Sequence, residues 1–240
     1  MTHPSYHLPN WPSLPHVGAV SIYDPNYNFF SGYHPKVTPI EFRRASKAIQ
    51  QLLKQPITMN RLQLQNHNVC VPASPWGYIK PADACYTTTQ QLACSISVAD
   101  CIPILLAHRQ KNWVAAVHAG WRGLYHNIIE HSLQNCPYPH EDIQAWLGPS
   151  ICQKNYEVGP DLYTKFIKKN PDYQRYFQQH GTRYYPDLQA IACDQLHQLR
   201  VNRIYRDTSC TYSTPHLPSH RQNPKNANRF VACVWLKPST

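Results

Sequence analysis

The chain has 240 residues, of which 42% are hydrophobic, so it can bury a substantial core and is not expected to be intrinsically disordered. The formal net charge of +10 favours anionic partners such as phosphate, but the basic residues are scattered and no zinc-finger, RRM or KH pattern is present, which argues against nucleic acid. The longest apolar run, residues 101–107, is far too short to cross a bilayer, and residues 1–15 contain no apolar signal segment. We therefore expect a cytoplasmic protein with no membrane partner.

The nine cysteines are irregularly spaced, and none forms a C-x-x-C pair. An odd number of cysteines with irregular spacing is not typical of a disulfide-bonded protein and is compatible with a reducing compartment. We expect that folding needs no disulfide and that most of the nine are small buried hydrophobic residues. One or two could instead be metal ligands or nucleophiles.

Residues 1–37 are rich in Pro and Tyr and show little periodicity, which predicts loops and short strands wrapped around the domain. A helix is expected to begin at Thr38. Thr38 can cap it, Pro39 suits the first helical position, and Glu41 completes a capping box.

The remaining elements follow from hydrophobic patterning. Short apolar or alternating runs predict strands over residues 94–98, 102–107, 113–117, 143–147, 203–205 and 230–236. Helical spacing predicts one helix after Gly123, a second from Pro160, and a third over residues 188–199. The mixture indicates an α/β (mixed α+β) fold, a layered sandwich of β-sheet and helices in a single domain spanning residues 1–240, with residues 1–37 as a loop-rich N-terminal wrap.

Glycine is scarce, and half of it falls in two short stretches. Only eight residues are glycine, and four of these are Gly120, Gly123, Gly148 and Gly159. This concentration predicts that these positions need either a positive φ or a close approach of the backbone.

Reactive side chains gather at the ends of the predicted strands. Asp100 and Cys101 separate two strands, and His118 and Arg122 follow the third. Either His118 activates Cys101 as a nucleophile, or both bind a soft metal such as zinc, for which His67 is a plausible third ligand. The structural alternatives are a core cysteine and a satisfied polar histidine. For Arg122 the alternative is a buried pair with a carboxylate, and for Asp100 a cap or turn role.

Four motifs are similar to those of one known family. VADCIPIL at residues 98–105, VHAGWRG at 117–123, LGPSI at 147–151 and YEVG at 156–159 together resemble the bacterial YfiH/YlmD family. That family was long labelled a multicopper polyphenol oxidase or laccase domain and is now regarded as a family of purine nucleoside-metabolising enzymes. The resemblance extends over residues 65–236 and implies a YfiH-like fold.

The resemblance also implies a site and a reaction. The family's metal triad corresponds to His67, Cys101 and His118, with Zn²⁺ as the metal. The implied reactions are phosphorolysis of adenosine, inosine, guanosine and methylthioadenosine, and deamination of adenosine by a zinc-activated water. Asp100 is the candidate for proton transfer or for orienting a ligand, and Arg122 for holding phosphate. Arg221 is a further candidate for substrate binding.

The chain departs from the family pattern at three places, and other functions stay open. Asn68 replaces a usual glycine, residues 17–21 are at best a remnant of a Gly-Gly-Val-Ser segment, and residues 219–222 read Ser-His-Arg-Gln. The alternatives are a metal-independent Cys–His hydrolase or deamidase, a non-enzymatic binding module and a copper polyphenol oxidase. The oxidase fits least, because the 14 histidines never form an H-x-H pair. The sequence leaves the preferred nucleoside and the oligomeric state open.

Overall fold

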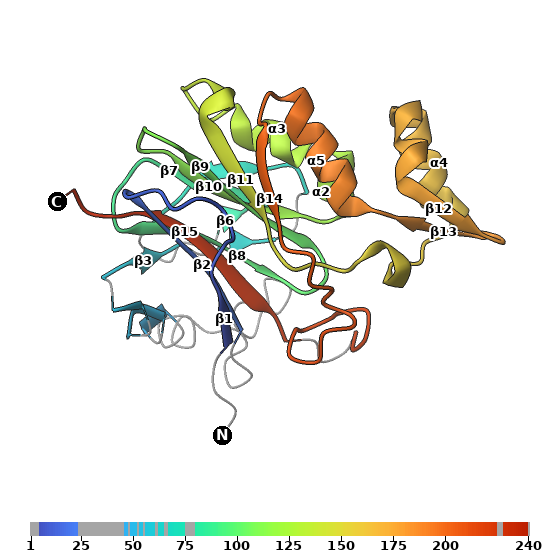
Figure 1. Cartoon of the computed structure of the whole chain (residues 1–240), viewed down its shortest axis with the longest axis horizontal. Helices are drawn as coiled ribbons and strands as arrows, with labels where there is room; N and C mark the ends of the chain where they lie inside the picture. The colour runs from blue at the N-terminus through green and yellow to red at the C-terminus, as the bar shows by residue number, and fades with distance from the viewer. Residues whose placement is uncertain are drawn as a thin grey trace.

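The computed structural model describes residues 5–23, 46–74, 80–224 and 228–239, except for residues 48, 52, 55, 61, 65 and 66. Two sheets form the centre of the molecule, and helices lie along the larger one (Figure 1). The larger sheet has six strands in the order β14 (Arg203–Arg206), β11 (Ile143–Leu147), β9 (Ile102–His108), β10 (Val114–Ala119), β7 (Ala84–Thr87) and β5 (Cys70–Pro72). The smaller has five, in the order β1 (Ser5–His7), β2 (Val17–Tyr23), β15 (Phe230–Leu236), β8 (Leu92–Val98) and β3 (Thr58–Met59).

Two short strand pairs and several helices complete the described fold. The pairs are β4 (Leu62–Gln63) with β6 (Lys80–Pro81), and β12 (Phe177–His180) with β13 (Arg183–Pro186). The α-helices are α2 (Trp121–Tyr125), α3 (Ile128–Leu133), α4 (Pro160–Lys169) and α5 (Leu188–Gln198). The 3₁₀ helices are η1 (His140–Asp142), η2 (Gln153–Asn155) and η3 (Pro171–Tyr176). The mixed α+β class is confirmed. Within the described part of the chain, no helix has the length and apolar character needed to cross a membrane.

Apolar clusters fill the spaces between these layers. Leu105 of β9 packs between the two sheets, whereas its neighbour Leu106 packs on the helical side with Ile129 of α3. Successive side chains of a strand point to opposite faces, so a strand covered on both faces reads as a continuous apolar run. A third cluster, which includes Ile49, covers the outer face of the smaller sheet.

Most of the predicted elements are confirmed, and one is wrong. The six predicted strands are β8, β9, β10, β11, β14 and β15, and the helices expected from Pro160 and over residues 188–199 are α4 and α5. The single helix expected after Gly123 is instead two short helices. Asn127 between them has a φ of 60°, a left-handed conformation that an α-helix cannot continue through. The predicted helix start at residues 38–41 lies outside the described residues, although those described between 46 and 53 are mainly helical.

The N-terminal segment contributes a core strand. β2 pairs with β15 along its length, from Val17 opposite Leu236 to Ile22 opposite Val231. A Cβ atom at Gly18 would lie 2.2 Å from the Trp235 ring, so only glycine fits there without a shift of the indole. Residues 17–21, which resemble a remnant of a family segment, therefore form part of the smaller sheet.

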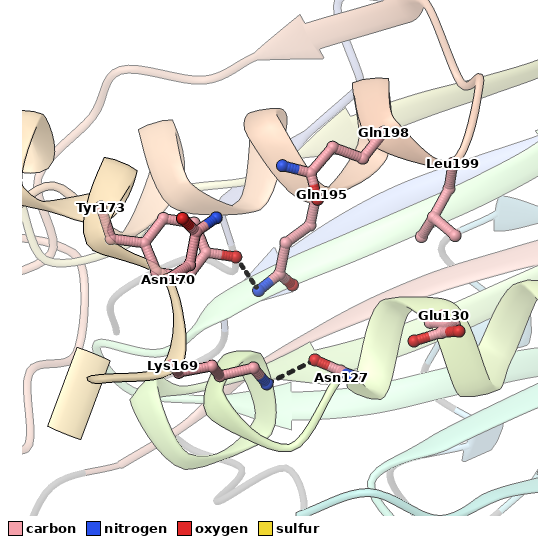
Figure 2. A pocket seen from close by; sticks show the side chains of 8 residues that line it. All are labelled: Asn127, Glu130, Lys169, Asn170, Tyr173, Gln195, Gln198 and Leu199. Atoms are coloured by element: carbon pink, nitrogen blue, oxygen red, sulfur yellow. Dashed lines mark hydrogen bonds between the residues drawn. The ribbon is translucent and has the colours of Figure 1, made fainter. Parts of the chain in front are cut away.

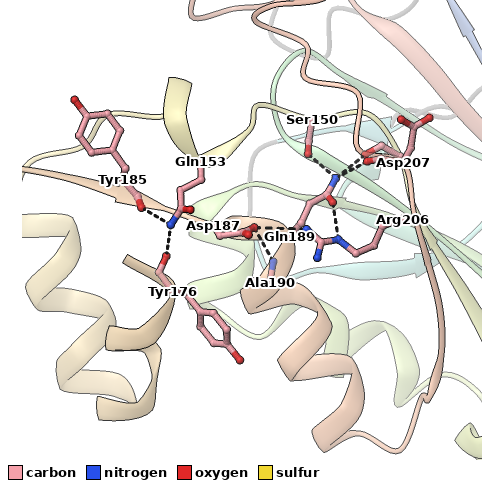
Figure 3. Close-up of polar contacts among 10 residues, drawn as sticks. Ser150, Gln153, Tyr176, Tyr185, Asp187, Gln189, Ala190, Arg206 and Asp207 are labelled. Carbon is pink, nitrogen blue, oxygen red and sulfur yellow. Dashed lines mark hydrogen bonds and ion pairs between the residues drawn. The ribbon is translucent and has the colours of Figure 1, made fainter. Parts of the chain in front are cut away.

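Two buried or half-buried glutamines hold the loop that follows β11 (Figure 3). Gln189 of α5 donates from Nε2 to the Ser150 hydroxyl at 3.0 Å and to the Asp207 carbonyl at 3.0 Å. Gln153 donates to the carbonyl oxygens of Tyr176 and Tyr185 at 3.1 and 3.0 Å. The loop is thus fixed to α5 and to β13, and Tyr156, three residues after Gln153, lies near Cys101.

Candidate functional site

The path of the chain between the two sheets creates the site. β8 belongs to the smaller sheet and β9 to the larger one, so residues 99–101 connect the sheets. β9 runs antiparallel to β10, with Pro103 opposite His118. On the other side of β10, Val117 lies opposite Ala84 of β7, and the His118 amide donates to the Asp83 carbonyl at 2.8 Å. These pairings bring Asp83, Cys101 and His118 together.

The His118 ring lies between a carboxylate and a thiol. Its Nδ1 is 3.1 Å from Oδ1 of Asp83, a residue with no exposed surface, and the ring also hydrogen-bonds to Cys101. Burial lowers the pKa of His118, but Cys101 and Asp83 outweigh it and raise that pKa to about 9. Burial raises the pKa of the Asp83 carboxyl group, but its hydrogen bonds to His118 and to the His67 backbone outweigh burial and hold that pKa below the usual value. Asp83 thus fixes the orientation of the ring.

The loop that carries His67 is attached to the same aspartate. The His67 amide donates to Oδ2 of Asp83, and His67 has a φ of 61°. The next carbonyl, that of Asn68, bonds to the His131 ring of α3 at 2.6 Å. Burial lowers the pKa of His67, and Arg122 acts in the same direction while Asp83 opposes it. His67 is therefore mainly neutral near pH 7, the form that ligates metals.

The donor types suit a zinc ion, which takes imidazole nitrogen and thiolate sulfur. A carboxylate on the second ring nitrogen of a ligating histidine is a common support for such sites, and Asp83 stands in this relation to His118. Among the described residues, however, no group of three His, Cys, Asp or Glu side chains lies in an arrangement that could hold a metal ion. Cys101 and His118 are in contact, and His67 interacts electrostatically with His118 and Asp83.

Two of the scarce glycines are required beside these residues. A Cβ atom at Gly120 would lie 2.8 Å from the Cys101 sulfur, and one at Gly148 would lie 2.8 Å from Pro103 Cγ. Of the four clustered glycines, none has a φ in the left-handed region. Of the two expected alternatives, close approach therefore applies at these glycines and a positive φ does not.

Asp100 takes up a structural position. It is 9% exposed and has a φ of 86°. Its Oδ1 accepts from the Thr211 hydroxyl at 2.7 Å, and its Oδ2 accepts from the Arg221 amide at 2.7 Å. Its own carbonyl accepts from the Ile151 amide at 2.9 Å. Asp100 thus joins three separate segments, as the cap or turn alternative predicts.

Two arginines and a tyrosine lie near Cys101. Arg122 is exposed and stacks on the Trp121 ring, with 4.3 Å from its guanidinium carbon to the ring centre. The alternative of a buried pair with a carboxylate is therefore wrong. Arg221 lies over the Tyr156 ring at 5.1 Å, and its guanidinium donates to the Glu157 carbonyl at 3.0 Å. Burial and the nearby Cys101 raise the pKa of Tyr156, which remains a neutral hydroxyl.

The sequence patterns assign no role to two residues of the site, Asp83 and Tyr156. Asp83 lies between two alanines, Ala82 and Ala84, just before a buried strand. An isolated carboxylate in such an apolar stretch is costly to bury unless it is paired, and this signal could have identified it. Tyr156 lies in one of the four motifs, but no local pattern distinguishes it from a core aromatic residue.

A pocket of about 370 Å³ lies elsewhere, among α3, η3 and α5 (Figure 2). Its lining consists of Asn127, Glu130, Lys169, Asn170, Tyr173, Gln195, Gln198 and Leu199. It includes none of the candidate site residues, so we do not associate it with the chemistry of Cys101 and His118.

Comparison with known proteins identifies the relatives of the chain. Residues 27–237 match the family described as "Multi-copper polyphenol oxidoreductase laccase". The Escherichia coli (strain K12) protein named purine nucleoside phosphorylase YfiH is 30% identical, over 95% of this chain and 98% of that protein. The protein of the same name from Shigella flexneri is 31% identical over the same shares.

Solved structures show the same fold. Neisseria meningitidis protein NMB0706 superposes with a TM-score of 0.82 at 27% identity, covering 97% of this chain and 99% of that one. YlmD from Geobacillus stearothermophilus has a TM-score of 0.77 at 20% identity, covering 92% and 93% of the two chains. The chain therefore belongs to the multi-copper polyphenol oxidoreductase laccase family, together with the YfiH proteins.

Proposed function

We propose that this chain is a zinc-dependent purine nucleoside phosphorylase of the cytoplasm. Its substrates are adenosine, inosine, guanosine and methylthioadenosine, with phosphate as the second substrate, and it also deaminates adenosine. Two relatives aligned over nearly their whole length are named purine nucleoside phosphorylase, which supports the phosphorolytic reaction.

The main structural support for this proposal is the hydrogen-bonded series formed by Asp83, His118 and Cys101. The Asp83 carboxylate holds Nδ1 of His118, so the other ring nitrogen points away from the carboxylate, and the ring also hydrogen-bonds to Cys101. His67, Cys101 and His118 would hold the zinc, which supplies Lewis-acid activation when bound. His118, whose pKa is raised to about 9, would give up one ring proton when zinc binds, and Asp83 would hold the remaining proton on Nδ1.

The outer residues would bind the substrates. The exposed Arg122 guanidinium offers paired N–H donors to phosphate oxygens. Arg221 and Tyr156 would contact the nucleoside, with the Tyr156 hydroxyl as a neutral hydrogen-bond donor. Asp100 would act as a positioning residue, because both of its carboxylate oxygens already accept hydrogen bonds from Thr211 and Arg221.

Metal analysis combined with product chromatography tests the proposal. The purified chain should contain about one zinc ion, and inosine should yield hypoxanthine only when phosphate is present. Adenosine should yield inosine without phosphate. Both activities and the zinc should be lost in His118→Ala and Cys101→Ala. His197→Ala is the matched control, because His197 is exposed on α5 away from the site. Copper in place of zinc, with oxidation of phenols, would support the oxidase label of the family instead.

One observation favours a second candidate, a metal-independent Cys–His hydrolase or deamidase. The hydrogen bond of Cys101 to His118, with Asp83 behind the ring, is also the arrangement that activates a thiol nucleophile. Such an enzyme would keep its activity in a metal chelator and lose it on alkylation of Cys101. Nucleoside turnover that disappears with the chelator and returns with added zinc would exclude this candidate.

A further inference from the structure

A pair of thiols outside the candidate metal triad lies close to the site. Cys152 follows the LGPSI motif, and Cys210 follows β14 by four residues. The two segments meet at a parallel bridge between Ser150 and Cys210, and the Cys152 amide donates to the Cys210 sulfur at 3.2 Å. Neither residue has a part in the proposed reaction.

The two sulfurs are in contact and share one donor. The Cys152 thiol hydrogen-bonds to the Cys210 sulfur. Nδ2 of Asn155 lies 3.3 Å from the sulfur of Cys152 and 3.3 Å from that of Cys210. Because the side-chain amide lies against both sulfurs, it holds the two cysteines side by side. Cys210 is 7% exposed, whereas Cys152 is half-buried, so a small reagent can approach from the Cys152 side.

These contacts favour a thiolate on one of the two cysteines. Burial raises the pKa of Cys210, but hydrogen bonds from Cys152, Asn155 and Ser213 outweigh it and lower that pKa to about 6. Burial and the neighbouring Cys210 raise the pKa of Cys152, which keeps its proton. A thiolate next to a protonated thiol is the combination in which the first is oxidised and the second completes a disulfide.

We propose that Cys152 and Cys210 form an oxidisable dithiol site that a peroxide converts into a disulfide. The Cys210 thiolate attacks one oxygen of hydrogen peroxide, the O–O bond breaks, and a sulfenic acid and hydroxide form. The Cys152 sulfur then attacks the sulfenic sulfur. The S–S bond forms, the S–O bond breaks, and the hydroxyl group leaves as water with the Cys152 proton. The hydroxide from the first step takes up the proton that Cys210 released on ionisation, so overall two thiols and one peroxide give one disulfide and two waters.

The position of the pair connects it to the candidate active site. Ile151, next to Cys152, donates its amide hydrogen to the Asp100 carbonyl, and Thr211, next to Cys210, donates its hydroxyl to Asp100. A disulfide brings its sulfurs to about 2.05 Å, much closer than a hydrogen bond does. Closure therefore draws together two segments that both contact Asp100.

Mass spectrometry of the full reduced chain tests the proposal. The protein is treated with one equivalent of hydrogen peroxide, free thiols are alkylated, and the product is digested with trypsin. A linked pair of peptides spanning residues 123–154 and 207–221 should appear, and dithiothreitol should remove it. The first peptide also contains Cys136, so fragmentation must assign the link to Cys152.

Single variants decide the outcome. Cys152→Ser and Cys210→Ser should both lose the link, while Cys193→Ser should keep it, because Cys193 is another partly exposed thiol that lies on α5. If Cys210→Ser does not fold, Cys152→Ser alone decides. A link that persists in Cys152→Ser, or peroxide that modifies Cys101 while Cys152 and Cys210 stay alkylatable, would overturn the proposal. The readout is a mass and does not depend on nucleoside turnover.

Discussion

Two buried aspartates flank Cys101, and they serve different parts of the molecule. Asp83 precedes β7 of the larger sheet, and its oxygens hold the His118 ring and the His67 backbone. Asp100 lies where the chain passes between the sheets, and its oxygens hold Thr211 and Arg221. In both residues the two carboxylate oxygens are occupied by hydrogen bonds. Of the two, only Asp83 uses its side chain to contact candidate metal ligands, namely the His118 ring and the His67 backbone amide.

The difference shows that the chemistry of a carboxylate depends on what occupies its oxygens. Asp100 is adjacent to Cys101 in sequence, and this makes it the obvious candidate for proton transfer. Asp83 is 18 positions away from Cys101, but β-sheet pairing places it beside His118. The residue nearest in sequence thus assembles the loops, and the distant one orients the reactive ring.

The sharpest test of this comparison is Asp83→Asn. It removes the negative charge behind His118, so the pKa of His118 should fall from about 9 in the metal-free protein, as NMR titration of the ring would show. The affinity for zinc should fall by about 10–100-fold, the usual loss when the carboxylate behind a ligating histidine is removed. Unchanged zinc binding would place Asp83 among purely structural residues.

Asp100→Asn should affect stability instead. An amide presents one acceptor where Asp100 presents two, so either the Thr211 hydroxyl or the Arg221 amide loses its partner. The free energy of unfolding should fall by about 1–3 kcal/mol, measured by urea denaturation. Zinc content should stay at the wild-type level. Loss of zinc at unchanged stability would reverse the roles assigned to the two aspartates.

Arg122→Ala should separate the two proposed reactions. Only phosphorolysis binds an extra anion, and a hydrogen bond to a charged group contributes about 1.5–3 kcal/mol, so phosphorolysis should slow by roughly tenfold or more. Adenosine deamination should change much less. Arg109→Ala is the control, because Arg109 pairs with Asp142 at the opposite end of β9. Equal loss of both reactions in the Arg122 variant would contradict a phosphate-binding role.

The smallest effect is expected from reductant. All nine cysteines are free thiols in the structure, and the fold is built from sheet pairing and apolar packing. Without added oxidant, thermal unfolding with and without dithiothreitol should therefore have the same midpoint. A large loss of stability on reduction would show that a disulfide supports the fold.

The sequence predicted the layered fold because its central strands are covered on both faces. Strands that are buried on both faces, such as β9 and β15, appear in the sequence as continuous apolar runs, so they can be predicted without a structure. The interruption of the helix at Asn127 could not be predicted from the sequence, because a left-handed residue between two helices leaves the spacing of their apolar residues unchanged. The motifs similarly indicated Cys101 and His118 but gave no role to Asp83, which strand pairing places beside the His118 ring.

The place of β15 in the smaller sheet has a consequence for how the protein folds during synthesis. β15 lies between β2 and β8, and these strands are far apart from it in the chain. The sheet therefore stays incomplete until residues 230–236 have left the ribosome, and the hydrogen bonds of Asp100 to residues 211 and 221 likewise form late. Such a high contact order favours slow folding, with the edges of β2 and β8 exposed to other chains in the meantime.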